Sequence, residues 1–485
     1  MLVSSAEIAR HMPDGFYIDG RWKQSASGRV RDIVSPSTEE AIFATPLATA
    51  DEIDDAIKAA RRAFDEGPWP RMSPQKRSEL MHLLADALSA RLPLLTRAWT
   101  AQVGAPISLA ARLAPLGCDR LRYFADLAKT FEFDHKRGHA RIIEEPVGVA
   151  ALIVPWNAAY PILMNKLGAA LAAGCTCIIK PSPESPLEAV LVAECADEVG
   201  FPSGVINVIL ADAAESALLA ASPAVEKVSF TGSVAAGSKI ASIVGARIGR
   251  VTLELGGKSA AILLDDIELE KALPALSPFI MPFSGQFCFS QTRLLVPRGR
   301  EHEIVAACAK TIEQLKVGDP WDASTALGPV LNRRQFGRIM GYIDQSLADG
   351  ACVVTGGRRS TCSNTGYYIE PTLFSDVSRD MSIAREEIFG PVVVIQIYDT
   401  VEEAIAIAND SDFGLSGSVF GKDIEKAVSV ATKIRSGQIG INGLRMSPEM
   451  PFGGFKMSGF GREGGPEGLR GFLETKAILS AYPPE

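Results

Sequence analysis

The sequence predicts an α/β protein whose central feature is a parallel sheet. From residue 149 to residue 255, short apolar segments alternate with segments of helical periodicity. The apolar segments are continuous, which is typical of parallel strands that helices cover on both faces. Strands are expected at residues 149–154, 176–179, 205–209, 227–230 and 251–255, and helices near residues 163–173, 187–198, 213–221 and 234–245. Ligands bind such sheets at the carboxyl ends of the strands, so functional residues are expected there.

Helices are expected before this sheet. Ile53, Ile57 and Phe64 recur at helical spacing. Ser73-Pro74 provides an N-cap and a first-turn proline for a further helix. These positions predict core packing and no chemistry.

A second α/β region follows at residues 257–440. Helical periodicity marks residues 301–315, 333–349 and 401–409, and strand patterns mark residues 351–355 and 391–397. This region predicts a second α/β domain.

Residues 128–147 have a different pattern. Charged and apolar residues alternate there, as in Arg141-Ile142-Ile143-Glu144-Glu145. The pattern predicts a two-stranded arm that leaves the domain. Unpaired strand edges pair readily with another chain, so we expect this arm to join subunits in an oligomer.

Composition excludes several classes of protein. A chain of 485 residues with 47% hydrophobic and 22% charged residues is typical of a soluble globular protein with more than one domain. The net charge of −8 makes nucleic acid an unexpected partner. The N-terminus has no basic region followed by an apolar run, and Asn165 and Lys166 interrupt the apolar stretch 161–175. Neither secretion nor a membrane span is therefore expected.

The cysteines predict a reducing compartment. The chain has eight, without the spacing of a disulfide framework, so we expect free thiols and a cytoplasmic location. Cys175 and Cys177 are the only close pair, and no histidine or second cysteine pair lies near them in the sequence. No metal site is expected.

Cys288 and Glu254 are candidate catalytic residues. They lie beside glycines, in Gly285-Gln286-Phe287-Cys288 and in Glu254-Leu255-Gly256-Gly257. A thiol and a carboxylate in such settings, far from histidine, suggest covalent catalysis with a separate water-activating base. A lone cysteine is more often a small core residue, however, and the flanking phenylalanines suit either a core or a substrate approach. Spacing alone leaves both interpretations open.

Polar residues follow three of the predicted strands. Asn157, in Pro155-Trp156-Asn157, is placed to donate to an oxyanion or to form an Asx-turn. Lys180 suits a nucleotide ribose or phosphate, or is an ordinary loop lysine. A helix is expected after Phe230-Thr231-Gly232-Ser233, and the free N–H groups at its N-terminus suit a phosphate. This segment does not match the usual dinucleotide-binding motif G-x-G-x-x-G.

Two other enzyme classes are disfavoured. Gly256-Gly257-Lys258-Ser259 is similar to the end of a Walker A loop, but Thr252 stands where the first glycine is required. ATP binding is therefore not expected. All five histidines lie outside these motifs, which argues against a Cys-His protease.

Together the motifs resemble the NAD(P)-dependent aldehyde dehydrogenase superfamily, in its hydrolytic branch. The matching segments occur in order over more than 300 residues. They are Pro155-Trp156-Asn157, Lys180-Pro181-Ser182, Phe230-Thr231-Gly232-Ser233, Glu254-Leu255-Gly256-Gly257-Lys258, Gly285-Gln286-Phe287-Cys288, Glu387-Ile388-Phe389-Gly390-Pro391-Val392 and Pro451-Phe452-Gly453-Gly454-Phe455-Lys456-Met457-Ser458-Gly459.

The resemblance implies a division of the chain. Residues 1–127 and 148–256 would form a Rossmann-type NAD(P)-binding domain, and residues 257–440 the catalytic domain. Residues 128–147 and 465–485 would form a small β oligomerisation arm, giving a homodimer or homotetramer.

The resemblance also implies a mechanism. The Cys288 thiolate attacks the aldehyde, and the Asn157 side chain and the Cys288 backbone N–H hold the oxyanion. Hydride transfer to the nicotinamide leaves a thioester, which water activated by Glu254 hydrolyses. Lys166 and Glu463 match positions that relay the proton. The implied cofactor-binding residues are Val154, Pro155, Trp156, Lys180, Ser182, Pro183, Glu184, Phe230, Gly232, Ser233, Leu255, Gly256, Glu387 and Phe389.

The chain departs from the family pattern at three positions. Pro183, followed by Glu184, stands where many members have the glutamate that binds the adenosine ribose. The absence of this glutamate removes the repulsion between a carboxylate and a 2′-phosphate, so NADP binding is allowed, although NAD is the expected cofactor. Asn165 and Ala158 stand where some relatives have bulkier residues. They imply a wider tunnel mouth that suits a hydrophobic or bulky aldehyde.

Two rival functions remain. A CoA-acylating dehydrogenase generally lacks the general-base glutamate, so Glu254 counts against it. An inactive structural member of the fold would not need Cys288, Glu254 and Asn157 together. The sequence does not identify the aldehyde, and Arg445 is expected to face solvent rather than bind an acidic substrate.

Overall fold

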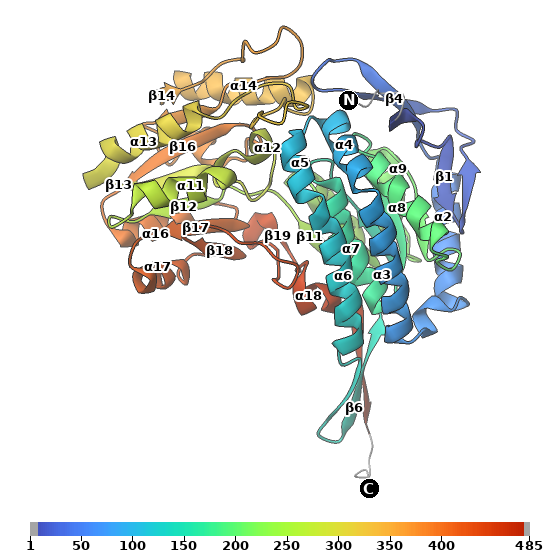
Figure 1. The fold of residues 1–485 in the computed structure, drawn as a ribbon. Helices are drawn as coiled ribbons and strands as arrows, with labels where there is room; N and C mark the ends of the chain where they lie inside the picture. The colour runs from blue at the N-terminus through green and yellow to red at the C-terminus, as the bar shows by residue number, and fades with distance from the viewer. Residues whose placement is uncertain (1–7, 480–485) are drawn as a thin grey trace.

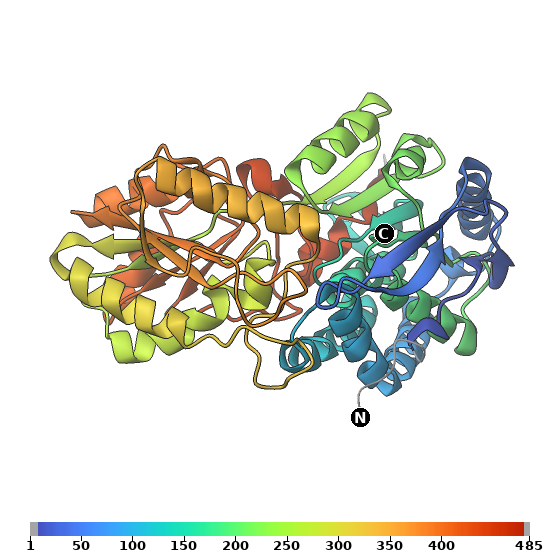
Figure 2. The same cartoon turned by 90° about the horizontal axis from the view of Figure 1, so that it is seen from above.

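The computed structural model describes residues 8–479. The first seven residues of the predicted cofactor domain and the last six of the predicted arm lie outside the described residues. Two α/β units, here called the first and second lobe, lie side by side, and a narrow β arm projects from the first (Figure 1). Seen from above, part of the red C-terminal segment lies between the two lobes (Figure 2).

The first lobe is built on an eight-stranded sheet in the order β19-β11-β10-β7-β8-β9-β1-β2. The strands from β11 to β9 are parallel, and β19, β1 and β2 run antiparallel to their neighbours. The bounds are β1 (Gly15–Ile18), β2 (Arg21–Gln24), β7 (Val149–Ile153), β8 (Thr176–Lys180), β9 (Ile206–Val208), β10 (Lys227–Thr231), β11 (Arg250–Glu254) and β19 (Gly459–Phe460). The five predicted parallel strands are therefore confirmed to within two residues at each end.

Helices cover both faces of this sheet, which explains its continuously apolar strands. On β7, Leu152 packs in one hydrophobic core and its neighbours Ala151 and Ile153 pack in the other. The first core includes α3 (Pro74–Ala90), α6 (Pro115–Thr130), α7 (Ala159–Ala173) and α8 (Leu187–Glu198). The second includes α2 (Ala50–Asp65), α9 (Ala213–Ala221) and α10 (Val234–Ala246).

The remaining N-terminal elements frame this lobe. The predicted cap of α3 is present, because Ser73 Oγ accepts a hydrogen bond from the Lys76 backbone N–H at 3.3 Å. Between α3 and α6 lie α4 (Leu92–Val103) and α5 (Ile107–Leu113). A separate hairpin comprises β3 (Val30–Val34) and β4 (Ala41–Pro46).

The second lobe is built on a seven-stranded sheet in the order β14-β15-β16-β13-β12-β17-β18. Only β14 is antiparallel to its neighbour. The strands are β12 (Ala260–Leu263), β13 (Arg293–Pro297), β14 (Cys352–Thr355), β15 (Thr372–Ser375), β16 (Val392–Tyr398), β17 (Ser416–Phe420) and β18 (Gln438–Ile441). The helices are α11 (Leu269–Ile280), α12 (Pro282–Gly285), α13 (Glu301–Glu313), α14 (Arg333–Ala348), α15 (Ser382–Arg385), α16 (Val401–Asn409) and α17 (Ile424–Ala431). The sequence predicts β14 and β16 but not the other five strands, because short apolar runs do not distinguish strand from buried helix.

The arm contains three strands rather than the two predicted. β5 (Asp134–Arg137) and β6 (Ala140–Pro146) form the expected pair. β20 (Leu473–Leu479), which follows α18 (Gly465–Arg470), pairs with the other edge of β6 along all seven of its residues. This third strand escapes a local pattern because its partner lies far away in the sequence.

Candidate active site

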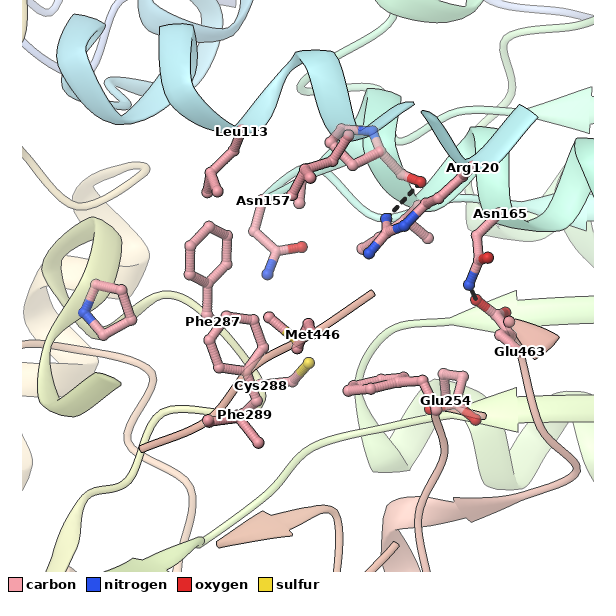
Figure 3. Close-up of a pocket in the computed structure, with 18 of the residues that line it drawn as sticks. Leu113, Arg120, Asn157, Asn165, Glu254, Phe287, Cys288, Phe289, Met446 and Glu463 are labelled. Atoms are coloured by element: carbon pink, nitrogen blue, oxygen red, sulfur yellow. Dashed lines mark hydrogen bonds between the residues drawn. The ribbon is translucent and has the colours of Figure 1, made fainter. Parts of the chain in front are cut away.

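A cavity of about 310 Å³ lies between the two lobes. Residues from α4 to α7, the end of β11, the segment before β13 and the loop after β18 line it. Cys288, Glu254 and Asn157 come from three separate segments and meet around this space (Figure 3). Glu463 also lines the cavity, so four of the five predicted catalytic residues share it.

A strained loop positions Cys288. Phe283 and Ser284 have left-handed backbone conformations with φ of 51° and 54°, which are uncommon for residues other than glycine. Gly285 follows with φ of 73°, and a Cβ atom there would lie 1.9 Å from the carbonyl oxygen of Gly390. Only glycine fits this close approach. Such strain is characteristic of functional sites.

Gln286 joins this loop to both lobes. Its Oε1 accepts a hydrogen bond from the Leu331 backbone N–H at 2.9 Å, and its Nε2 donates to the Phe283 carbonyl at 3.1 Å. The Gln286 carbonyl accepts a hydrogen bond from Asn157 Nδ2 at 2.8 Å. Trp99 Nε1 in turn donates to the Asn157 carbonyl at 2.9 Å. The Asn157 amide is thus held beside the Cys288 loop, and its second hydrogen remains for a ligand in the cavity.

The Cys288 thiol is partly exposed to the cavity. Desolvation, together with the carboxyl groups of Glu387 and Glu254, raises the pKa of this thiol. The backbone N–H groups of Cys288 and Phe289 act in the opposite direction. The thiol is therefore the resting form near neutral pH, and its proton must leave when the sulfur attacks.

Glu254 ends β11 and is 2% exposed. Neither of its carboxyl oxygens has a hydrogen-bond partner in the part of the chain that the structure describes. Burial and the nearby Glu463 raise the pKa of Glu254 well above its ordinary value, although Lys166 and Arg462 oppose the change. Leaving a buried polar group unpaired is costly, and strongly shifted pKa values concentrate at functional sites.

Lys166 and Glu463 form a buried ion pair close to Glu254. Lys166 Nζ donates to Glu463 Oε1 and also to Ser229 Oγ, the latter at 3.0 Å. Asn165 Nδ2 donates to Glu463 Oε2 at 3.4 Å and lines the cavity. Lys166 does not line the cavity, but its ion-pair partner Glu463 does.

The parallel register aligns the strand ends that carry the predicted cofactor-binding residues. Ile153 pairs with both Lys180 and Phe230, and Thr231 pairs with Glu254. Val154 continues this alignment, because its backbone N–H donates to the Lys180 carbonyl at 3.0 Å. The segments that follow these ends contain the predicted residues Pro155, Trp156, Ser182, Pro183, Glu184, Gly232, Ser233, Leu255 and Gly256.

Lys180 is buried, and desolvation lowers its pKa to about 8 despite the opposing effect of Glu184. Pro183 and Glu184 line a smaller cavity of about 180 Å³. Arg31, from β3, lies 3.8 Å from Glu184 and also lines this cavity. Ser182 Oγ donates to Glu184. The contribution of Arg31 was not predicted, because β3 is far from these residues in the sequence.

The N-terminus of α10 lies at the same edge of the sheet. Ser233 caps it, since Oγ accepts a hydrogen bond from the Ala236 backbone N–H at 3.3 Å. The Gly232 N–H donates to the Glu254 carbonyl at 3.0 Å. A Cβ atom at Gly237 would lie 2.5 Å from Leu255 Cδ2, so glycine lets the helix approach β11 closely. The positive end of a helix at this edge favours an anion.

Glu387 and Phe389, in the second lobe, contact residues that follow strands of the first sheet. Glu387 Oε1 accepts a hydrogen bond from the Gly257 N–H at 2.9 Å, and a Cβ atom at Gly256 would lie 2.3 Å from Glu387 Oε2. Burial raises the pKa of Glu387 to about 7. The Phe389 ring meets Trp156 edge-on, with 5.7 Å between ring centroids. These contacts place Glu387 beside Gly256 and Phe389 beside Trp156.

Much of the cavity wall was not predicted. Three helices of the first lobe contribute Trp99, Leu109, Arg112, Leu113, Leu116 and Arg120. In the sequence, apolar residues at helical spacing cannot be told from core residues.

The aromatic residues around Cys288 divide between the two roles that the sequence left open. Phe289 lines the cavity, and Phe283 is 1% exposed and packs in a hydrophobic core. Phe287 lines the cavity and is also part of that core. Arg445 is exposed and does not line the cavity, in agreement with the expectation that it faces solvent.

Two features are absent from residues 8–479. No group of three or more His, Cys, Asp or Glu side chains in this range is arranged to hold a metal ion. No helix in this range is both long and apolar enough to cross a membrane.

Comparison with solved structures identifies close matches. Aldehyde dehydrogenase C of Pseudomonas syringae, solved with NAD+ and octanal, has a TM-score of 0.95 and 40% identity, with 98% of each chain covered. An aldehyde dehydrogenase of Mycobacterium tuberculosis, solved with NAD+, has a TM-score of 0.95 and 39% identity, covering 97% of this chain and 99% of that one.

Sequence comparison agrees. The 3-succinoylsemialdehyde-pyridine dehydrogenase of a Pseudomonas species is 41% identical over 468 residues, covering 96% of this chain and 98% of the relative. The geranial dehydrogenase of Castellaniella defragrans is 38% identical over 468 residues, covering 95% of this chain and 98% of the relative. The sequence model of the aldehyde dehydrogenase family matches residues 22–478. The resemblance and the α/β fold class are thereby confirmed: the chain belongs to the aldehyde dehydrogenase family.

Proposed function

We propose that this protein oxidises an apolar or bulky aldehyde to the carboxylic acid, with NAD as the hydride acceptor. The observation that carries the proposal is the arrangement of Cys288, Asn157 and Glu254 around one cavity. A nucleophile, an oxyanion donor and a base that face a single space are the groups that acyl-enzyme chemistry requires.

The first half-reaction uses Cys288 and Asn157. The Cys288 sulfur attacks the carbonyl carbon and forms a C–S bond, while the thiol proton leaves the site. The oxygen becomes an oxyanion, which accepts hydrogen bonds from the free Asn157 Nδ2–H and the Cys288 backbone N–H. Loss of hydride from the same carbon converts the thiohemiacetal to a thioester.

NAD, when bound, supplies the acceptor for this hydride. The donor set at the sheet edge fits such a group, because it combines the buried Lys180 ammonium, the capped N-terminus of α10 and the carboxyl group of Glu387. Lys180 and Ser182 would bind the adenosine ribose, and Ser233 the pyrophosphate. Glu387 and Phe389 would position the nicotinamide ribose and ring. The NAD+ complexes of the related proteins support NAD over NADP.

The second half-reaction uses Glu254. Water adds to the thioester carbonyl as Glu254 accepts its proton, and the C–S bond then breaks to release the acid and Cys288. Lys166 and Glu463 lie where they can pass that proton onward. Burial and Glu463 raise the pKa of Glu254, which makes its carboxylate a stronger base for the proton of water.

Product analysis with purified protein tests this proposal. With NAD and an aldehyde such as octanal, we expect the free carboxylic acid both with and without CoA. An acyl-CoA product would instead assign the protein to the CoA-acylating branch. No oxidation of any aldehyde would indicate an inactive structural member of the fold. Rates with NAD and NADP compared on one substrate would test the cofactor preference.

We propose the arm of β5, β6 and β20 as the contact that joins subunits into a dimer or tetramer. Its outer edges lack strand partners among residues 8–479, and Ile478 is 47% exposed. Light scattering should give a multiple of the 51.7 kDa chain mass, and a monomer would refute the proposal. The eight free thiols support a cytoplasmic location, which cell fractionation would test.

A further inference from the structure

The most unusual feature of the cavity wall is a cation without a counter-ion. Arg120, on α6, lines the cavity together with apolar side chains (Figure 3). Its Nη1 donates to the Pro161 carbonyl at 2.7 Å. Over residues 8–479, no carboxylate lies within ion-pair distance of its guanidinium.

Two fully buried arginines of this protein make more hydrogen bonds than the half-buried Arg120. Arg293 donates to three backbone carbonyls at 2.9 to 3.0 Å. Arg77 donates to two, and its guanidinium lies 5.6 Å from the centre of the Phe133 ring. Neither of them lines this cavity. Arg120 is the one of these three whose remaining donors lie at the cavity wall, where a ligand can reach them.

The other charged groups of the cavity form no ion pair with Arg120 among residues 8–479, although the Glu463 carboxylate acts on it electrostatically. They are Arg112, Glu254 and Glu463. Glu463 is bonded to Lys166 Nζ, and the raised pKa of Glu254 favours its neutral form. Arg112 adds a second positive charge, so the cavity favours an anion.

The composition of the wall restricts the form of that anion. Leu116 lies one turn before Arg120 on α6, and Pro161 and Ile162 lie on the adjoining helix α7. A substrate that reaches from Cys288 to Arg120 therefore passes along hydrocarbon surface. A ligand with an apolar chain and a hydrogen-bond acceptor at its far end matches both the hydrocarbon wall and the Arg120 guanidinium.

We propose that Arg120 binds the carboxylate of a substrate whose other end is the aldehyde, so that the substrate class is an ω-oxo carboxylic acid. The product is then a dicarboxylic acid. This inference rests on the proposed oxidation of an aldehyde and narrows its apolar substrate to one whose hydrocarbon chain ends in a carboxylate. Arg120 acts as a specificity-determining residue, because it contacts the substrate at the end remote from the reacting carbon.

Matched substrates test the inference. With purified full-length protein and NAD, kcat/KM is measured for ω-oxo acids of four to nine carbons, for their methyl esters and for the unsubstituted aldehydes of equal length. At one chain length or more, we expect the acid to exceed its ester by about tenfold, because a charge-assisted hydrogen bond is worth about 1.5 kcal/mol or more. The preference should lie mainly in KM, since binding at this end is uniform in ground and transition states.

Variants assign the preference to this side chain. In Arg120→Met, the ratio of acid to ester should fall to about one. Because the ratio is taken within one protein, partial loss of folded enzyme cancels. Arg120→Lys should retain part of the preference, since lysine keeps the charge but loses the bidentate geometry. The control Arg445→Met removes an exposed arginine outside the cavity and should leave the ratio as in the parent.

The failures are distinguishable. Oxidation of neutral aldehydes with no preference for any acid would overturn this inference and leave the proposed function intact. An acid preference that survives in Arg120→Met would also overturn it. Oxidation of none of these aldehydes would overturn the proposed function, and this inference with it.

Discussion

The two ends of the cavity differ in how they are built. At the reactive end, Glu254 is the last residue of a strand, Asn157 and Cys288 lie in loops, and the backbone before Cys288 is left-handed. At the other end, α4, α5 and α6 present regular helical faces with apolar side chains.

The two ends also differ in how their polar groups are satisfied. Both carboxyl oxygens of Glu254 lack hydrogen-bond partners among the described residues, and the pKa of the Cys288 thiol is raised above its ordinary value. The helical wall has ordinary geometry, with Arg120 as its exception. Backbone strain and the unpaired oxygens of Glu254 therefore gather where bonds change, whereas the helical wall is built, Arg120 apart, from side chains that would suit any core.

The strongest test of the reactive end is removal of its nucleophile. In Cys288→Ala, no thioester can form, and we expect kcat for aldehyde oxidation to fall by at least about 10⁴-fold. NADH formation followed at 340 nm measures the loss. Cys352→Ala removes an exposed thiol far from the cavity and serves as the control. Parent-like turnover in Cys288→Ala would exclude covalent catalysis by this residue.

Glu254→Gln should separate the two half-reactions. We expect steady-state turnover to fall by about 10²- to 10⁴-fold, while a rapid first burst of NADH remains, since the thioester still forms. In the parent protein, turnover should rise with pH through the raised pKa of Glu254, because only the carboxylate accepts the proton of water. That dependence should be absent from Glu254→Gln. Loss of the burst would show that Glu254 also takes part in the first half-reaction.

A matched pair of asparagines tests the oxyanion contact. Asn157→Ala should reduce kcat by about 10²- to 10³-fold, since one oxyanion donor is worth roughly 3 to 4 kcal/mol. Asn165 lines the same cavity but donates to Glu463, so Asn165→Ala should have a smaller effect. Equal losses in the two variants, measured with the same aldehyde, would contradict the assignment to Asn157.

The helical wall should give the smallest effects. Leu116→Ala removes apolar contact area, and we expect kcat/KM for octanal to fall by about 10-fold or less. Propanal, with a shorter chain, should be affected less. A comparison of the two substrates in the parent and the variant measures this difference. A kcat loss that is equal for both aldehydes would place Leu116 at the reactive end instead.

The sequence predicts the reactive end well because its residues obey local rules. Parallel strands are recognisable as continuous apolar runs, and their ends must meet at one edge, so Asn157, Lys180 and Glu254 were expected together. Predicted helices at residues 187–198, 213–221 and 401–409 match the observed bounds. The local pattern predicts only two strands of the arm, and residues 465–485 were assigned to it through the family resemblance alone, because pairing of β20 with β6 depends on residues more than 300 positions apart.

By itself the sequence determined the parallel sheet, the order of its functional segments and the family to which they belong, because each depends on short-range pattern and residue type. Only the tertiary structure decided which apolar helix positions face the cavity, and that Arg120 lines it without an ion-pair partner among the described residues. The physical reason is that a leucine or an arginine on a helix has the same sequence pattern whether it faces a core, the solvent or a substrate. Which of these surrounds it depends on the packing of α4 to α7 against a lobe that begins more than 80 residues later.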